Sequence, residues 1–97
     1  MRQVGLSDLD IAARAVMMVE PEDQPTQAAR LIAAAHCADH VRKRTGHPAP
    51  DGGTGSLYAQ ASLARPAAHG VADAAYCEAL MTVLAALKAH RAAHLPR

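Results

Sequence analysis

The sequence predicts an all-α protein, a small helical domain of three to four helices with a helical hairpin, a Gly/Pro-rich loop and a long C-terminal helix. Alanine, the strongest helix former, supplies much of the 51% hydrophobic content, while β-branched and aromatic residues are scarce. Apolar residues recur at helical spacing, and prolines or glycines separate the segments. The 97 residues suffice for a single helical domain, 1–97, whose core relies on small side chains because Trp and Phe are absent.

The first helix is expected over about 8–19, where apolar residues form one stripe. Ser7 can cap its start, with Asp10 in the capping-box position. Pro21 and Pro25 then interrupt the helical pattern, because proline is not tolerated inside a helix. This turn should join the two helices of the hairpin.

The second helix is expected over about 25–44. Asp23 or Gln24 would cap it, and a proline in the first turn is tolerated. Gly46 stands where a left-handed residue ends many helices. The basic residues 42–44 in the last turn suit the negative end of the helix dipole.

The second half of the chain contains the loop 45–55, with four glycines and two prolines, a short helix over about 56–64 and a long helix over about 72–93. Asp73 is a possible cap for the long helix. Because so short a chain buries little surface, a second subunit packing on this helix would add stability. Such a stripe is ordinarily core, but apolar residues on more than one side of the helix leave a face for another subunit. The residues predicted as the homo-oligomer interface are Tyr76, Leu80, Val83, Leu84 and Leu87.

The charge distribution and the cysteines limit which partners and which cellular location are expected. The formal net charge is +1, but residues 1–40 hold six acids and three bases, while 41–97 hold seven bases and three acids. Cys37 and Cys77 lie far apart and are expected to be reduced thiols. No apolar run approaches a membrane span and no secretory signal is legible, so a cytoplasmic location without a membrane partner is expected.

The stretch AHCADHVRKRTGHP, residues 35–48, concentrates side chains that could bind a metal ion or phosphate. His36 and His40 share a helix face, as in zinc proteases. Those enzymes also need a third ligand and a glutamate next to the first histidine, and here Cys37 stands in place of that glutamate. Cys37 points about 100° away from His36 on a helix. A metal-dependent enzyme using these three residues is therefore the weakest hypothesis, solvated histidines are the simpler interpretation, and no cofactor is predicted.

Basic residues in the same stretch suggest contact with phosphates. They surround a helix end and its exit loop, and such cations can give salt-dependent binding to DNA. A capping role at the helix C-terminus explains the same residues, and no helix-turn-helix is legible. The residues predicted to contact DNA are Arg42, Lys43, Arg44 and His47, with Lys88 and Arg91 if folding brings them near.

Catalytic motifs are missing from the sequence. The stretch DGGTG has no strand before it and lacks the lysine and Ser/Thr of a P-loop. The serines lack a nucleophile-elbow context, and the carboxylates are too scattered for an acid–base pair. The sequence therefore predicts a non-enzymatic protein.

Five segments, in order along the chain, form a recognisable pattern: MRQV, AARAV, RLIAAAHCADHVRKRTGHPAP, GTGSL and ADAAYCEALMTVLAAL. In this pattern the chain resembles a small family of uncharacterised proteins from marine and photosynthetic alphaproteobacteria. The resemblance covers most of the chain. The departures lie in the loop, where the family's tryptophan is absent near Pro50 or Asp51 and Thr54 replaces an aspartate.

That family is associated with gene transfer agents, phage-like particles that package host DNA, in which a protein of this size would be the small terminase subunit. The resemblance implies a non-enzymatic helical oligomer that binds double-stranded DNA weakly and non-specifically. It also implies recruitment of a large terminase, or another packaging protein, which supplies the ATPase and nuclease. The alternative is a helical protein–protein interaction module without DNA binding.

Overall fold

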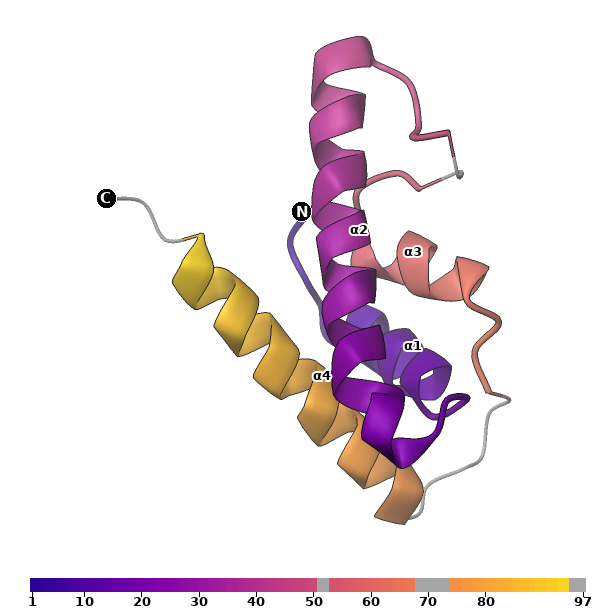
Figure 1. Cartoon of the computed structure of the whole chain (residues 1–97). Helices are drawn as coiled ribbons and strands as arrows, with labels where there is room; N and C mark the ends of the chain where they lie inside the picture. The colour runs from indigo at the N-terminus through magenta and orange to yellow at the C-terminus, as the bar shows by residue number, and fades with distance from the viewer. Residues whose placement is uncertain (51–52, 68–73, 95–97) are drawn as a thin grey trace.

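The computed structural model describes residues 1–50, 53–67 and 74–94. No strand occurs in these ranges, so the predicted all-α fold is confirmed. The described residues form four α-helices and one 3-10 turn: α1 (Leu6–Val16), η1 (Pro21–Asp23), α2 (Gln24–Thr45), α3 (Leu57–Leu63) and α4 (Ala74–Ala93) (Figure 1).

The long helix α2 forms the spine of the molecule. It packs chiefly against α4 and also against α3, while α1 packs chiefly against α3 and α4. Figure 1 shows α1 running obliquely to α2, and α4 diverging from α2 toward its C-terminal end. The first two helices, joined by η1, contact each other less than they contact the later helices, because α1 packs chiefly against α3 and α4.

The start of α1 differs from the prediction. Its N-cap is Gly5, whose N–H donates to Asp8 Oδ2 at 2.9 Å, so the helix begins before Ser7 and does not use it as a cap. The other carboxylate oxygen of Asp8 accepts from the N–H of Tyr58 at 2.9 Å. Asp8 thus ties the first turn of α1 to the first turn of α3. The helix also ends at Val16, earlier than predicted.

The ends of the other helices follow local capping rules. Gly46 adopts the left-handed conformation predicted for it, with φ 76°, and its N–H donates to the carbonyl of Arg42 at 2.8 Å. The hydroxyl of Ser56 accepts from the N–H of Ala59 at 3.0 Å and caps α3. Asp23 precedes α2 but makes no side-chain cap. The predicted cap Asp73 lies outside the described residues.

The core is built largely from alanine, which allows the helices to approach closely. Six of its buried residues are alanines, and larger side chains fill the remaining space. The largest fully buried side chains are Ile32, Leu57, Val16 and Val83. Since no large aromatic ring is fully buried here, the contacts depend on close helix packing.

A hydrogen bond between helices joins α4 to α1. The hydroxyl of Tyr76 donates to Asp10 Oδ1 at 2.7 Å. This bond raises the pKa of Tyr76 above its ordinary value, and burial adds to the effect. Asp10 also pairs with Arg14 at 3.5 Å.

We expect Tyr76→Phe to lower the free energy of unfolding by about 1 kcal/mol, because it removes this hydrogen bond and keeps the ring. Urea unfolding measures the loss. Tyr58→Phe is the matched control, since Tyr58 is 49% exposed and should lose little. Equal losses in the two variants would contradict a stabilising bond to Asp10.

Candidate functional site

The predicted oligomer stripe lies mostly inside the chain's own fold. Val83 and Leu87 are buried in the core, and Tyr76 and Leu80 are partly buried against it. Among the five predicted residues, only Leu84 is exposed, at 44%. The prediction for Val83 and Leu87 is therefore corrected: the intramolecular contacts of α4 already cover them.

The outward face of α4 carries a different apolar row. Cys77, Met81 and Leu84 follow one another at helical spacing and all are exposed, with Met81 at 63%. We call these three residues the outer strip. The same spacing leads on to Lys88 and Arg91, which are also exposed, so one face of α4 changes from apolar to basic along its length.

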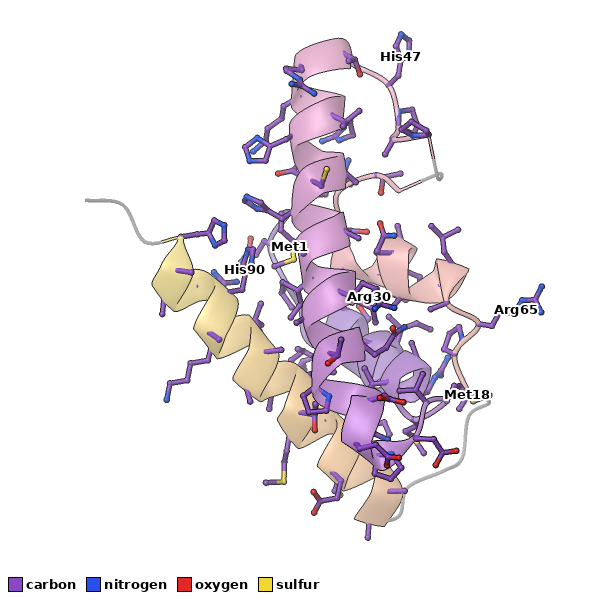
Figure 2. All side chains as sticks on the ribbon, in the orientation of Figure 1. Met1, Met18, Arg30, His47, Arg65 and His90 are labelled. Atoms are coloured by element: carbon purple, nitrogen blue, oxygen red, sulfur yellow. The ribbon has the colours of Figure 1, made fainter. Side chains whose placement is uncertain are left out.

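The predicted DNA-contacting residues of α2 are all exposed. Arg42, Lys43 and Arg44 occupy the last turn, and His47 projects beyond it (Figure 2). Lys43 differs from its neighbours because its Nζ lies 3.1 Å from Asp39 Oδ2. The basic end of α2 therefore has cations that face solvent and one that is partly engaged.

Asp39 is a buried charge at the centre of this region. Its Oδ2 lies 3.2 Å from the amino group of Met1 as well as 3.1 Å from Lys43 Nζ. Burial opposes the ionised form, but the hydrogen bonds from Lys43 and the amino group outweigh it and hold the pKa of Asp39 below its ordinary value. Gly55 packs directly on Asp39, so the Gly/Pro-rich loop returns to α2 at this residue.

Four histidines meet where α4 lies beside α2. The Nε2 atoms of His36 and His40 are 3.2 Å apart, and the ring of His36 lies 4.9 Å from that of His90 and 4.7 Å from that of His94, measured between centroids. The rings of His90 and His94 stack at 4.1 Å. Figure 2 places His90 opposite Met1, in the space between the two helices.

Two histidines of the cluster, His36 and His90, favour the neutral imidazole because their pKa values are lowered. Burial lowers the pKa of His36. The charge of the Met1 amino group and the neighbouring ring of His40 lower this pKa further. Burial also lowers the pKa of His90, with His94 as the next cause. Neutral rings are the form that can accept hydrogen bonds or bind a metal ion.

We therefore expect the metal-free protein to lose stability as the pH falls below about 6.5. Histidines of the unfolded chain take up protons near 6.5, whereas His36 and His90 in the fold resist protonation down to lower pH. Stability is then full above this range and declines through it. Urea midpoints at about pH 7.5 and about pH 5.5, with a chelator present, measure the decline.

His36→Gln combined with His90→Gln should flatten this pH dependence, whereas His47→Gln should leave it unchanged. His47 is the matched control because it is exposed. An unchanged pH dependence in the double variant would show that other groups cause the decline.

A family model matches residues 2–87 and is described as a domain of unknown function, DUF7742. The chain belongs to the DUF7742 family. No curated protein and no solved structure matches the chain. Among the residues that the structure describes, no helix has both the length and the apolar character that crossing a bilayer requires.

The DUF7742 match includes His36 and His40 but ends before His90 and His94. The sequence suggested that His36 and His40 act together with Cys37. In the structure Cys37 is an exposed free thiol, and the histidines that lie near His36 are His90 and His94. A signal for this was present. His90 and His94 continue the helical spacing of the buried residues Val83 and Leu87, so they lie on the face of α4 that meets α2.

Proposed function

We propose that this DUF7742 protein is a non-enzymatic, oligomeric DNA-packaging adaptor of small-terminase type, acting in the cytoplasm. It would bind double-stranded DNA weakly and without sequence preference, and recruit a large terminase. The observation that carries the proposal is the outward face of α4, where the outer strip of exposed apolar residues continues into Lys88 and Arg91. The resemblance to small terminases of gene transfer agents supports the packaging role.

Self-association is supported by the exposure of the outer strip. Met81 and Leu84 lie on successive turns of one helix, and a second copy would remove both from water. Cys77 extends the row in the direction of the helix start. Helices that pair along such a row commonly do so with their own copies, because the two surfaces are then identical.

DNA binding is supported by exposed cations on two helices. Arg91 lines the same hollow as His36, and the basic end of α2 begins fewer than two turns beyond His36. Arg42 and Arg44 therefore follow, along α2, the hollow that Arg91 lines. A surface of this kind binds phosphates by charge and by release of counterions, which gives little sequence preference.

Light scattering at tens of micromolar tests self-association. The protein is expected to form an oligomer, and Met81→Glu with Leu84→Glu should dissociate it because charges would be buried at the contact. Leu63→Glu is the control, since Leu63 is 51% exposed on α3, away from the outer strip. A wild-type monomer would contradict the oligomeric part of the proposal.

A DNA shift assay over a salt series tests the second part. Affinity should fall as salt rises, and Arg42→Glu with Arg44→Glu should lower the slope of log K against log salt by about 2, because two phosphate contacts are lost. Arg30→Glu with Arg65→Glu changes the net charge equally on exposed residues elsewhere and should preserve most of the binding (Figure 2).

Salt-independent binding, absent binding, or equal losses in the two charge-reversal variants would contradict the DNA contact. If DNA binding were absent and the oligomer persisted, the protein would be an interaction module without DNA. Co-purification with a large terminase tests the recruitment step separately.

A further inference from the structure

The histidine cluster has the dimensions of a metal site. The ligand nitrogens of His36, His90 and His94 all lie within 4.8 Å of one another. Two ligand nitrogens of a tetrahedral zinc ion are about 3.3 Å apart, given zinc–nitrogen bonds of about 2.0–2.1 Å. For all three nitrogens to bind one ion, the most widely separated pair must come closer by about 1.5 Å. Rotation of the partly exposed histidine side chains can provide this movement.

His40 lies close enough to His36 to serve as a further ligand. Its Nε2 lies 3.2 Å from Nε2 of His36, close to the separation of two nitrogens bound to one tetrahedral ion. Each helix therefore contributes a pair of imidazoles spaced four residues apart, His36 with His40 on α2, and His90 in the last turn of α4 with His94 directly after that helix. This spacing places both members of a pair on one face of their helix.

Hydrogen bonds orient at least one ring for metal binding. Nδ1 of His94 lies 2.8 Å from the carbonyl oxygen of His90, and because a carbonyl only accepts, this nitrogen carries the proton. The lone pair of the imidazole is then on Nε2. Fixing the tautomer through the opposite ring nitrogen is the usual arrangement around histidines that bind metals.

The ligand atoms select the kind of ion. A hollow of about 430 Å³ beside the cluster is lined by Met1, Arg2 and Arg91 as well as by His36, His90 and His94. No carboxylate belongs to the ligand group among the described residues. Magnesium and calcium prefer oxygen ligands, whereas imidazoles suit zinc, copper, nickel and cobalt. The arginines repel all of these dications alike, so the nitrogen ligands make the selection.

We propose that His36, His90 and His94 bind one divalent transition-metal ion of the zinc type between α2 and α4. His40 or water completes the coordination. Binding at Nε2 of His36 requires the hydrogen on that nitrogen to move to another ring nitrogen, because only the lone pair of a neutral imidazole binds the ion. Because α4 diverges from α2 toward its C-terminal end (Figure 1), the ion cross-links the two helices at a point where apolar packing has ended.

Isothermal titration calorimetry with Zn²⁺ tests the site on the full chain. We expect one ion per chain and no heat with Mg²⁺. His36→Ala, His90→Ala and His94→Ala should each weaken binding more than about tenfold, since even residues that only orient ligands contribute that much. His47→Ala and Cys37→Ala are the controls, because both residues are exposed and lie outside the cluster.

Several outcomes overturn the proposal. No Zn²⁺ binding, or an equal loss in His47→Ala, removes the site. Unchanged affinity in both His90→Ala and His94→Ala would mean that the helical pair His36 and His40 binds the ion alone. A loss in Cys37→Ala would mean that sulfur takes part.

Cobalt substitution gives a second readout that does not depend on affinity. Co²⁺ bound to the chain should give the visible absorption of a tetrahedral site with nitrogen ligands, without the near-ultraviolet charge transfer of a thiolate. His94→Ala should abolish it, and because His94 is exposed this variant should keep the helical circular dichroism of the parent. Persistence of the spectrum in a folded His94→Ala variant would overturn the three-histidine assignment. Oligomerisation and DNA binding are measured separately, so this test stands apart from the proposed function.

Discussion

Replacing Gly55 by alanine is expected to lower the free energy of unfolding by about 3 kcal/mol or more, a large share of the stability of a small domain. Gly55 has φ 102°, a conformation that side chains disfavour. A Cβ there would also lie 2.8 Å from both Cα and Cβ of Asp39. Conformational strain and a steric clash therefore add in one substitution.

The clash is costly because the added Cβ would press on atoms that cannot move away easily. Asp39 is part of α2, so its Cα cannot withdraw without displacing the longest helix. The carbonyl of Gly55 also accepts the N–H of Arg2 at 2.9 Å, which fixes the loop from the other side. Relief of the clash would have to break the contact between the N-terminal segment and the loop, or the contact between the loop and α2.

Gly46→Ala is the matched control for Gly55→Ala. Gly46 also has a positive φ, 76°, but no atom lies within 4 Å of the position of an added Cβ. This variant should lose only the conformational part, about 1 kcal/mol. Urea unfolding of the two variants separates strain from clash, and equal losses would show that the loop does not press on Asp39.

The fold class could be predicted because its signals are local. Alanine content, helical spacing and the prolines and glycines between segments are properties of neighbouring residues, and Gly46 ends α2 as its type suggests. The start of α1 was missed because its cap is a glycine, Gly5, whose N–H donates a hydrogen bond to Asp8. Glycine has no side chain to announce a cap in the sequence.

The buried face of α4 could be predicted only in part. Both of its faces carry apolar residues, and periodicity alone does not say which one the chain covers for itself. The structure buries Val83 and Leu87 and leaves Met81 and Leu84 in water. That choice depends on how α1 and α2 approach the helix, which is tertiary information.

The histidine cluster shows the same limit for the site. His36 and His40 were visible as a pair, and the exposure of the basic residues that follow them agrees with a solvated helix end. The partners His90 and His94 come from the other end of the chain, and only the packing of α4 beside α2 brings them near. Extending the buried spacing of Val83 and Leu87 along α4 would have placed them on the correct face.

Leu57→Ala is expected to lower the free energy of unfolding by about 2–5 kcal/mol, because it leaves a cavity in a well-packed core. Leu57 is 1% exposed, and in α3 it is the only buried side chain that is both large and apolar. A helix of seven residues has little stability of its own, so α3 depends on the contacts that hold it against α1 and α2.

The Leu57→Ala substitution should also loosen parts of the structure outside the cavity. α3 holds the Gly/Pro-rich loop in place, because Ser56 caps it directly after Gly55, and Asp8 binds the N–H of Tyr58. Loosening α3 would therefore weaken the contact between Gly55 and Asp39, and hydrogen exchange should accelerate at the N–H groups of α3 and of Arg2 together. Leu63→Ala removes the same side chain from the exposed side of the same helix and should change stability by no more than about 0.5 kcal/mol. If the two leucine variants unfolded at the same urea concentration, α3 would not be anchored by Leu57, and the loop would have to be held by Asp8 and Asp39 alone.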